Sequence, residues 1–104
     1  MIITNTRTIH TVINESASMK LQGEVQFNAE GAITSFNGQF YKLPNEEGVD
    51  FGEYAGDFWF AENEDGTVSK SVTSIPNGKM SECCDFLEAT VSELHEFNKP
   101  EEQA

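Results

Sequence analysis

Few side chains in this sequence could serve as a catalytic base or nucleophile. Histidine, the most common general base, occurs only as His10 and His95, which are separated by most of the chain. The two cysteines, Cys83 and Cys84, are adjacent and have an acidic residue on each side, and these carboxylates oppose formation of a nucleophilic thiolate. No nucleophile is paired with a base and an orienting group in a recognisable pattern. We therefore expect a protein that is not an enzyme.

Ligands for a metal ion are also sparse. A structural zinc site needs about four cysteine or histidine ligands at regular spacing, which two adjacent cysteines and two distant histidines do not provide. Calcium prefers clustered oxygen ligands, and two acidic runs offer them without the spacing of an EF-hand. One run contains Glu46, Glu47, Asp50 and Glu53, and the other contains Glu62, Glu64 and Asp65. We expect no resident cofactor or metal, with a weak, loop-ordering calcium site as the alternative.

The strongest compositional feature is negative charge. The chain has 18 acidic and 6 basic residues, which give a formal net charge of −12. The charge is segregated, because residues 1–43 contain three acidic and three basic residues, whereas residues 44–104 contain fifteen acidic residues and three lysines. An acidic surface repels nucleic-acid phosphates and anionic lipids, so direct binding to either is not expected. A charged partner should be basic, unless the acidity serves solubility alone.

Aromatic side chains are concentrated between residues 51 and 60. They are Phe51, Tyr54, Phe58, Trp59 and Phe60, with Glu53 and Asp57 between them. Neighbouring side chains of a strand point to opposite faces, so if Phe58 and Phe60 face the core, Trp59 lies on the other face of the sheet. There Trp59 is either covered by a loop or forms the centre of a contact surface, as tryptophan often does at interfaces.

The strands that would position these residues are predicted from alternating apolar and polar side chains. The clearest alternation runs over residues 19–28, and it resumes over residues 32–42 after the turn-forming segment Asn28–Gly31. These segments predict a β-hairpin. One face of the second strand is expected to carry Thr34, Phe36, Gly38 and Phe40.

Three further segments complete the predicted sheet. An earlier strand is expected somewhere within Thr6–Asn14, where β-branched residues are frequent. After a main loop over Leu43–Gly52, strand character returns at Glu53–Glu62 and again at Thr67–Ser74. The intervening Asn63–Gly66 is a strong turn signal, so these two strands predict a second hairpin.

The last element has the period of a helix. Its apolar residues fall within about 140° on a helical wheel, and Asn77 or Ser81 is expected to cap its first turn. The apolar stripe consists of Met80, Cys83, Cys84, Leu87, Val91 and Leu94. The opposite face carries Glu82, Asp85, Glu93 and Glu96. We expect this helix to pack against the sheet and to present carboxylates to solvent.

Together these patterns predict one compact α+β domain over residues 1–99, with residues 100–104 as a flexible acidic tail. The domain is expected to be an antiparallel β-meander of about five strands, including two clear hairpins, packed by one C-terminal α-helix. Adjacent cysteines on one helix cannot readily bridge each other, so the fold should not depend on disulfides. No signal peptide or membrane-spanning stretch is recognisable, so we expect a cytoplasmic protein without membrane binding.

For function, we expect a small non-enzymatic interaction module that binds a basic protein surface, for example a nucleic-acid mimic that inhibits a DNA- or RNA-binding protein. Carboxylates three residues apart on a helix advance about 4.5 Å, which is comparable with the phosphate spacing along one DNA strand. Acidic residues would steer and fix the partner, and Trp59 or Tyr54 would supply a desolvated anchor. The expected partner-binding residues are Glu46, Glu47, Asp50, Glu53, Tyr54, Asp57, Trp59, Glu82, Asp85, Glu93 and Glu96.

Two other classes of function remain open at this stage. A small ligand or a weakly bound metal would occupy a pocket between sheet and helix, although its lining residues suit a core equally well. Those residues are Phe36, Phe40, Phe58 and Phe60. Self-association through an exposed strand edge is opposed by the net charge of −12 on each chain, so we expect a monomer or a weak dimer.

Overall fold

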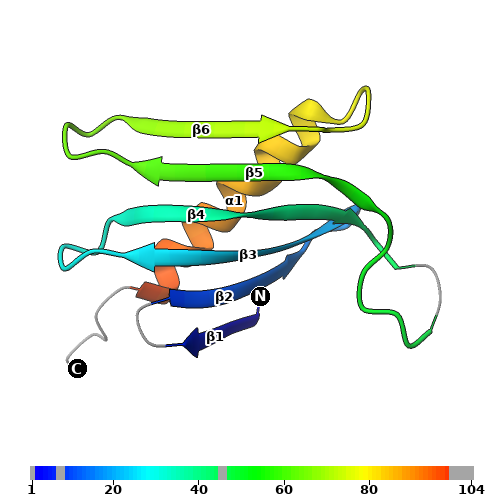
Figure 1. Cartoon of the computed structure of the whole chain (residues 1–104), viewed down its shortest axis with the longest axis horizontal. Helices are drawn as coiled ribbons and strands as arrows, with labels where there is room; N and C mark the ends of the chain where they lie inside the picture. Colours follow the sequence, from blue (N-terminus) through cyan, green and yellow to red (C-terminus); the bar gives the residue numbers. More distant parts are fainter. Residues whose placement is uncertain (1, 7–8, 45–46, 99–104) are drawn as a thin grey trace.

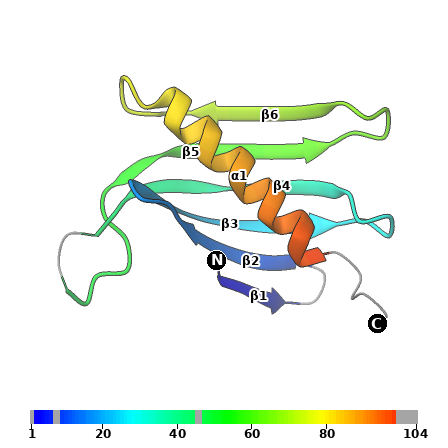
Figure 2. The ribbon, with the colours of Figure 1, turned by 180° about the vertical axis from the view of Figure 1, so that it is seen from behind.

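A computed structural model of the protein describes residues 2–6, 9–44 and 47–98. Within these residues, six antiparallel strands form one sheet in sequence order, and one helix crosses a face of that sheet diagonally (Figure 1, Figure 2). The elements are β1 (Ile2–Thr6), β2 (Ile9–Glu15), β3 (Met19–Phe27), β4 (Ile33–Lys42), β5 (Tyr54–Glu62), β6 (Val68–Thr73) and α1 (Met80–Asn98). The predicted α+β meander with a C-terminal helix is confirmed. The expected acidic tail lies outside the described residues.

The sheet gains its sixth strand at the N-terminal edge. The single strand expected within Thr6–Asn14 is β2, and β1 pairs with it in an antiparallel ladder that includes Ile3 opposite Val12. The sequence of β1 is two isoleucines followed by three polar residues, so it has no alternation that would predict a half-buried strand. Pairing with β2 therefore creates an element that the local pattern does not indicate.

A β-bulge in β5 changes the face on which Tyr54 lies. Tyr54 pairs with Tyr41 and Gly56 pairs with Phe40, so Ala55 has no partner of its own on β4. The extra residue reverses the alternation at this point. Tyr54 consequently lies on the face opposite to the inward Phe58 and Phe60, although a strict two-residue period counted back from them would place Tyr54 on their face.

A second irregularity corrects the predicted position of Thr34. Gln26 pairs with Ser35 and Phe27 pairs with Ile33, so Thr34 is passed over in the β3–β4 ladder. Ile33 is buried and Thr34 is exposed. The prediction that Thr34 shares the inward face of β4 is therefore wrong, because a strict two-residue period cannot anticipate a bulge.

The hydrophobic core lies between the sheet and α1. The sheet contributes Val12, Met19, Leu21, Val25, Ile33, Phe36, Phe40, Ala55, Phe58 and Phe60, and the helix contributes Cys83, Phe86, Leu87, Val91 and Leu94. Phe58 is central, with its ring centroid 4.8 Å from that of Phe36 and 5.1 Å from that of Phe40. The phenylalanines that could have lined a ligand pocket are therefore packed against one another in the core.

A pair of glycines allows the ring of Phe58 to lie close to the sheet. Gly23 of β3 is directly opposite Gly38 of β4. A Cβ atom added at Gly38 would lie 2.0 Å from the carbonyl oxygen of Gln22. A Cβ atom at Gly23 would lie 2.4 Å from the carbonyl oxygen of Asn37 and 2.9 Å from the ring of Phe58. No other residue type fits either position without moving backbone atoms.

A buried hydrogen-bond network fixes α1 on β2. Asn14 is 5% exposed, and its Nδ2 donates to Oγ1 of Thr90 at 2.8 Å and to Oε2 of Glu93 at 2.9 Å. The Thr90 hydroxyl donates in turn to the carbonyl of Phe86 at 2.8 Å. Buried polar groups are costly only when they lack partners, so this satisfied network specifies where the helix docks.

Replacement of Asn14 by alanine should lower the free energy of unfolding by about 1–3 kcal/mol, because Glu93 and the hydroxyl of Thr90 lose their shared donor. Urea unfolding of the variant and of the native protein measures this difference. Asn77→Ala, which truncates an exposed asparagine, is the matched control and should stay within about 0.5 kcal/mol of the native protein. Equal midpoints for the two variants would contradict a structural role of the network.

The start of α1 differs from the expected cap. Lys79 donates its N–H to the carbonyl of Pro76 at 3.0 Å, and this turn places Lys79 directly before the first helical residue, Met80. Asn77 lies within the turn and Ser81 lies inside the helix, so neither occupies the capping position. The cap prediction is wrong because the turn after Pro76 shifts the helix start.

The two cysteines have different environments on α1. Both are free thiols; Cys83 is fully buried and Cys84 is half-buried. Burial raises the pKa of the Cys83 thiol above its ordinary value. The folded state therefore disfavours the Cys83 thiolate. The contribution of this thiol to the free energy of unfolding is fully present below about pH 8.5, and it is lost as the pH rises through the folded-state pKa.

Alkylation should distinguish the two thiols. At pH 7.5, iodoacetamide is expected to label Cys84 in the folded protein, whereas Cys83 should react only after denaturation. Mass spectrometry of the intact native chain and of the Cys84→Ser variant measures the labelling of each site. Rapid labelling of Cys84→Ser without denaturant would contradict the burial of Cys83.

Candidate functional site

One face of the sheet carries no described helix. Figure 1 shows this open face toward the viewer with α1 behind it, and Figure 2 shows α1 in front of the other face. The register places mainly amide, hydroxyl and aromatic side chains on the open face. From β2 to β6 the residues on this face include Thr11, Ile13, Lys20, Gln22, Glu24, Asn37, Gln39, Tyr41, Tyr54, Asp57, Trp59, Ser69, Ser71 and Thr73.

Trp59 lies in the middle of β5 on the open face. It is opposite Asn37 of β4 and Ser71 of β6. Its side chain is 40% exposed, although tryptophan is usually well buried. Trp59 is therefore not covered by a described loop, and its expected place at the centre of a contact surface stays a prediction.

A hollow of about 650 Å³ lies beside Trp59. It is lined by Thr34, Trp59, Ala61, Glu62, Asn63, Glu64 and Asp65, and these residues are called the Trp59 surface below. Residues of the β5–β6 turn contribute most of its polar groups, and Thr34 comes from the start of β4. Both turns, β3–β4 and β5–β6, lie at the same end of the sheet (Figure 1). Among the residues that the structure describes, the lining contains three carboxylates and no base.

Hydrogen bonds fix the turn that supplies these carboxylates. Asp65 accepts bonds from the Thr67 hydroxyl at 2.6 Å and from the Thr67 N–H at 3.0 Å. These two bonds, led by the one from the hydroxyl, hold the pKa of Asp65 below its usual range. Asn63 donates to the Thr67 hydroxyl at 2.9 Å and to the Ser69 hydroxyl at 3.2 Å. The Asp65 carboxylate is thus ionised and held in place at neutral pH.

A second lining carboxylate, that of Glu62 at the end of β5, is engaged toward the core side. Its Oε1 accepts a bond from the Ile33 N–H at 2.7 Å, and its Oε2 lies 2.8 Å from Nε2 of His95. Glu62 therefore ties β4 to α1 as well as bordering the hollow. Glu64 is exposed at the tip of the turn.

A second aromatic group lies at the opposite end of the open face. The rings of Tyr41 and Phe51 are 4.8 Å apart, and Nζ of Lys20 lies 4.8 Å from the centroid of Phe51. Lys20 also donates to the carbonyl of Asp50 at 2.6 Å. These contacts hold the β4–β5 loop against the sheet. Lys20 already contacts this aromatic group, whereas no base is among the described residues that line the Trp59 surface.

Two predicted partner-binding residues of β5 bond to each other. The Tyr54 hydroxyl donates to the Asp57 carboxylate at 2.5 Å, and this bond is the main reason why the pKa of Tyr54 is raised. Tyr54 and Asp57 share the open face with Trp59, so the structure brings these three predicted residues together. Trp59 is the one among them whose side chain borders the hollow.

The predicted residues of α1 lie on the other side of the molecule. Glu82 accepts a bond from the hydroxyl of Ser18, which is the main cause of its lowered pKa, and it pairs with Lys79 at 3.5 Å. Glu93 accepts a bond from Asn14. Asp85 and Glu96 are exposed on the same helix. A flat partner cannot contact these carboxylates and Trp59 at once, so the predicted residues do not form one surface.

The loop acids are dispersed in the same way. Glu53 pairs with Lys42 at 3.4 Å, and Glu47 and Asp50 are exposed in the β4–β5 loop. Glu46 lies outside the described residues.

Within the described part of the chain, no three histidine, cysteine or carboxylate side chains come together as ligands for a metal ion. No helix among the described residues is long and apolar enough to cross a membrane.

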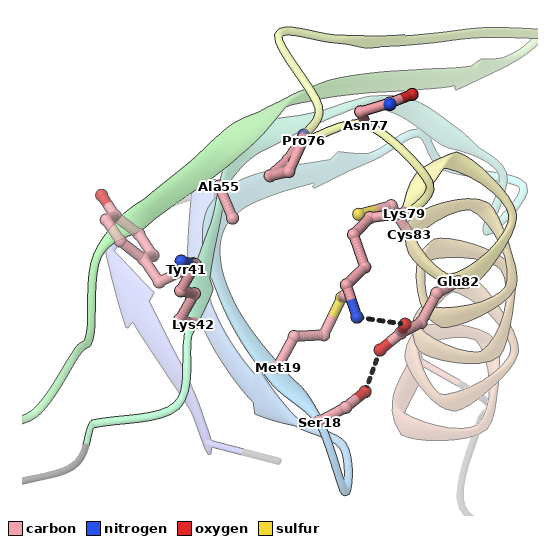
Figure 3. A pocket seen from close by; sticks show the side chains of 10 residues that line it. All are labelled: Ser18, Met19, Tyr41, Lys42, Ala55, Pro76, Asn77, Lys79, Glu82 and Cys83. Carbon is pink, nitrogen blue, oxygen red and sulfur yellow. Dashed lines mark hydrogen bonds and ion pairs between the residues drawn. The ribbon is translucent and has the colours of Figure 1, made fainter.

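A smaller hollow of about 420 Å³ lies between the start of α1 and the end of the sheet (Figure 3). Its lining is Ser18, Met19, Tyr41, Lys42, Ala55, Pro76, Asn77, Lys79, Glu82 and Cys83. Figure 3 shows Glu82 bonded to both Ser18 and Lys79 at the side of the hollow. This polar bridge closes part of the space, and none of the four core phenylalanines lines it.

Several residues of the Trp59 surface were not among the predicted binding residues. Thr34 was assigned to the inward face, and Glu64 and Asp65 were considered only as calcium ligands. A signal was present, because the turn Asn63–Gly66 follows Trp59 by a few residues on the same strand. This spacing puts the turn at the end of the strand nearer to Trp59, so its polar side chains were candidates for the same surface.

Comparison of the chain with protein-family models, with curated proteins and with solved structures gave no match. The function is therefore inferred from the chemistry of the open face.

Proposed function

We propose that the protein is a non-enzymatic interaction module that binds a basic protein segment through the Trp59 surface. One observation carries this proposal: an exposed tryptophan borders a hollow whose described lining residues include three carboxylates and no base. The remaining lining groups are small or neutral, and they leave the tryptophan ring accessible from the hollow.

This combination of groups suits an arginine or lysine side chain. A cation over the face of a tryptophan ring is attracted by the ring quadrupole, and the attraction increases when the pair is partly desolvated. A guanidinium group can stack on the ring while its N–H groups donate to a neighbouring carboxylate, which favours arginine over lysine. Glu64 and Asp65 supply such carboxylates beside Trp59.

The charge of the whole chain supports the same choice of partner. With a formal net charge of −12, the protein attracts basic surfaces over a distance of about one Debye length and repels acidic ones. On the open face, the register places Glu24 and Asp57 near the centre, and Lys20 is the one base that the described residues put there. A cytoplasmic protein with a basic nucleic-acid-binding surface is the class of partner that we propose.

A binding experiment with a single substitution tests the proposal. The probe is a short peptide that alternates threonine and arginine, and isothermal titration calorimetry measures its affinity. Trp59→Ala is expected to raise the Kd about tenfold or more, because the substitution removes the stacking surface. Met80→Ala is the matched control, since Met80 is a similarly exposed apolar residue at the start of α1. The control should bind within about twofold of the native protein.

Salt separates this mode of binding from an apolar one. The affinity of the native protein should fall between low and physiological ionic strength, because exposed charges are screened. If Trp59→Ala and Met80→Ala bound the peptide equally well, or if the affinity did not change with salt, the Trp59 surface would not be a site for a basic segment.

A further inference from the structure

Strand β6 forms one edge of the sheet and has an open backbone. It is the last strand in the order, and Figures 1 and 2 show no other strand beyond it. Natural edge strands are usually protected by a proline, a bulge or an inward charge. Val68–Thr73 contains no proline and pairs with β5 without a register shift. Its one charged residue, Lys70, is an inward charge, but Glu88 pairs with it at 2.8 Å, so Lys70 does not repel an incoming basic strand as an unpaired lysine would.

The hydrogen-bonding groups at this edge can be assigned from the register. Asn63 donates its N–H to the carbonyl of Thr67 at 2.8 Å, so these two residues begin the β5–β6 ladder as a hydrogen-bonded pair. Hydrogen-bonded and non-hydrogen-bonded pairs alternate along an antiparallel ladder. Val68, Lys70 and Val72 therefore direct their N–H and C=O groups away from β5, toward the open edge.

Only small side chains stand between this edge and Trp59. On the open face, β6 presents Ser69, Ser71 and Thr73, and Ser71 is directly opposite Trp59. Neighbouring strands lie about 4.8 Å apart, so a strand added beside β6 would lie about 10 Å from β5. An extended arginine side chain spans much of that distance, and the hydroxymethyl group of Ser71 does not block it.

Acidic groups lie near both ends of β6. Glu64 and Asp65 precede the strand in the β5–β6 turn, and Asp57 of β5 is opposite Thr73 at its other end. The net charge of −12 opposes pairing of this edge with a second copy of the chain. The charge around the edge therefore complements a basic strand.

We propose that the partner supplies an extended basic segment that adds to the sheet as a seventh strand beside β6. An arginine of the segment lies opposite Ser71 and extends across it to stack on Trp59. Flanking basic residues of the segment lie near the carboxylates at the two ends of β6. This inference rests on the proposed function, because it takes a basic partner as given, and it adds how the partner's backbone is bound.

Two methylated peptides test the backbone contact without any change to the protein. In a peptide that alternates threonine and arginine, the arginines face Trp59 when they are opposite Ser69, Ser71 and Thr73. The N–H groups of the threonines then point to β6, and those of the arginines point away. N-methylation of the threonines should weaken binding about tenfold or more, because the bonds to β6 are lost. N-methylation of the arginines, with the same charge and the same number of methyl groups, should change the Kd less than threefold.

Two substitutions at one position test the same contact from the protein side. Lys70→Pro removes an N–H that points to the open edge, so it leaves the β5–β6 ladder intact, as proline on an edge strand does. Lys70→Thr removes the same positive charge and keeps the N–H. The threonine variant should bind at least as well as the native protein, because the chain becomes more acidic. The proline variant should bind about tenfold more weakly while its circular dichroism remains native.

The outcomes separate the two proposals. If both methylated peptides bind equally and Trp59→Ala still loses affinity, strand addition is overturned and the proposed function stands. If Trp59→Ala binds like the native protein while the methylated peptides differ, the edge binds a strand without the Trp59 surface, and the arrangement proposed here is overturned. A free chain that light scattering shows to be a dimer, and that Lys70→Pro makes monomeric, would assign the edge to a second copy instead.

Discussion

Replacement of Phe58 by alanine is expected to lower the free energy of unfolding by about 3–5 kcal/mol. Phe58 is 3% exposed and packs against the rings of Phe36 and Phe40, and a Cβ atom added at Gly23 would lie 2.9 Å from its ring. Truncation to alanine therefore loses a buried aromatic ring and leaves a cavity in the middle of the core. A domain of this size is typically stable by about 5–15 kcal/mol, so the loss would be a large part of the total.

Urea unfolding at constant m-value measures the effect of Phe58→Ala. Phe97→Ala makes the same chemical change near the end of α1, where the ring is 47% exposed, and it should cost about 1 kcal/mol or less. If the two variants had similar midpoints, the ring of Phe58 would not lie in the core.

Alanine at Gly38 is expected to cost about 3 kcal/mol, at the upper end for overpacking. The added Cβ atom would lie 2.0 Å from the carbonyl oxygen of Gln22 and 2.5 Å from Cα of Gly23. Both contacts are with backbone atoms of β3, so relief requires the two central strands to move apart. That movement would weaken the ladder between β3 and β4 and displace the ring of Phe58 above it.

Asn37→Ala is the control for Gly38→Ala, because Asn37 is the preceding residue of β4 and its side chain is exposed on the open face. This variant should unfold within about 0.5 kcal/mol of the native protein. Thermal unfolding of the two variants side by side measures the difference. A Gly38→Ala protein as stable as Asn37→Ala would show that β3 and β4 do not approach as closely as described.

The sequence predicts the fold well where the hydrophobic period is regular. The alternation over β3 and β4 and the helical stripe of α1 follow from side chains that must face one core, so the type of each element could be read directly. The stripe of α1 is right for Cys83, Leu87, Val91 and Leu94, which are buried, and wrong for Met80, which is 49% exposed. The prediction fails at Thr34 and Tyr54, which lie at bulges. A bulge depends on how two strands match along their ladder, and this match is a property of the pair rather than of either strand.

The candidate site could be predicted in part. Trp59 was expected on the face opposite to Phe58, and it lies there because β5 is regular at this point. The sequence alone could not show how far Trp59 lies from the acidic residues of the helix with which it was grouped. The structure instead places the turn acids Glu64 and Asp65 around the same hollow as Trp59, because the β5–β6 turn begins soon after Trp59.

The order of the strands also bears on how the chain folds. Every strand of the sheet pairs only with strands next to it in sequence, so each ladder closes a short loop and no strand has to be inserted between two others. The sheet can grow by one hairpin at a time. The bond from Asn14 to Thr90, in contrast, joins residues 76 positions apart. Docking of α1 therefore adds a contact between residues far apart in sequence, which the ladders of the sheet do not supply.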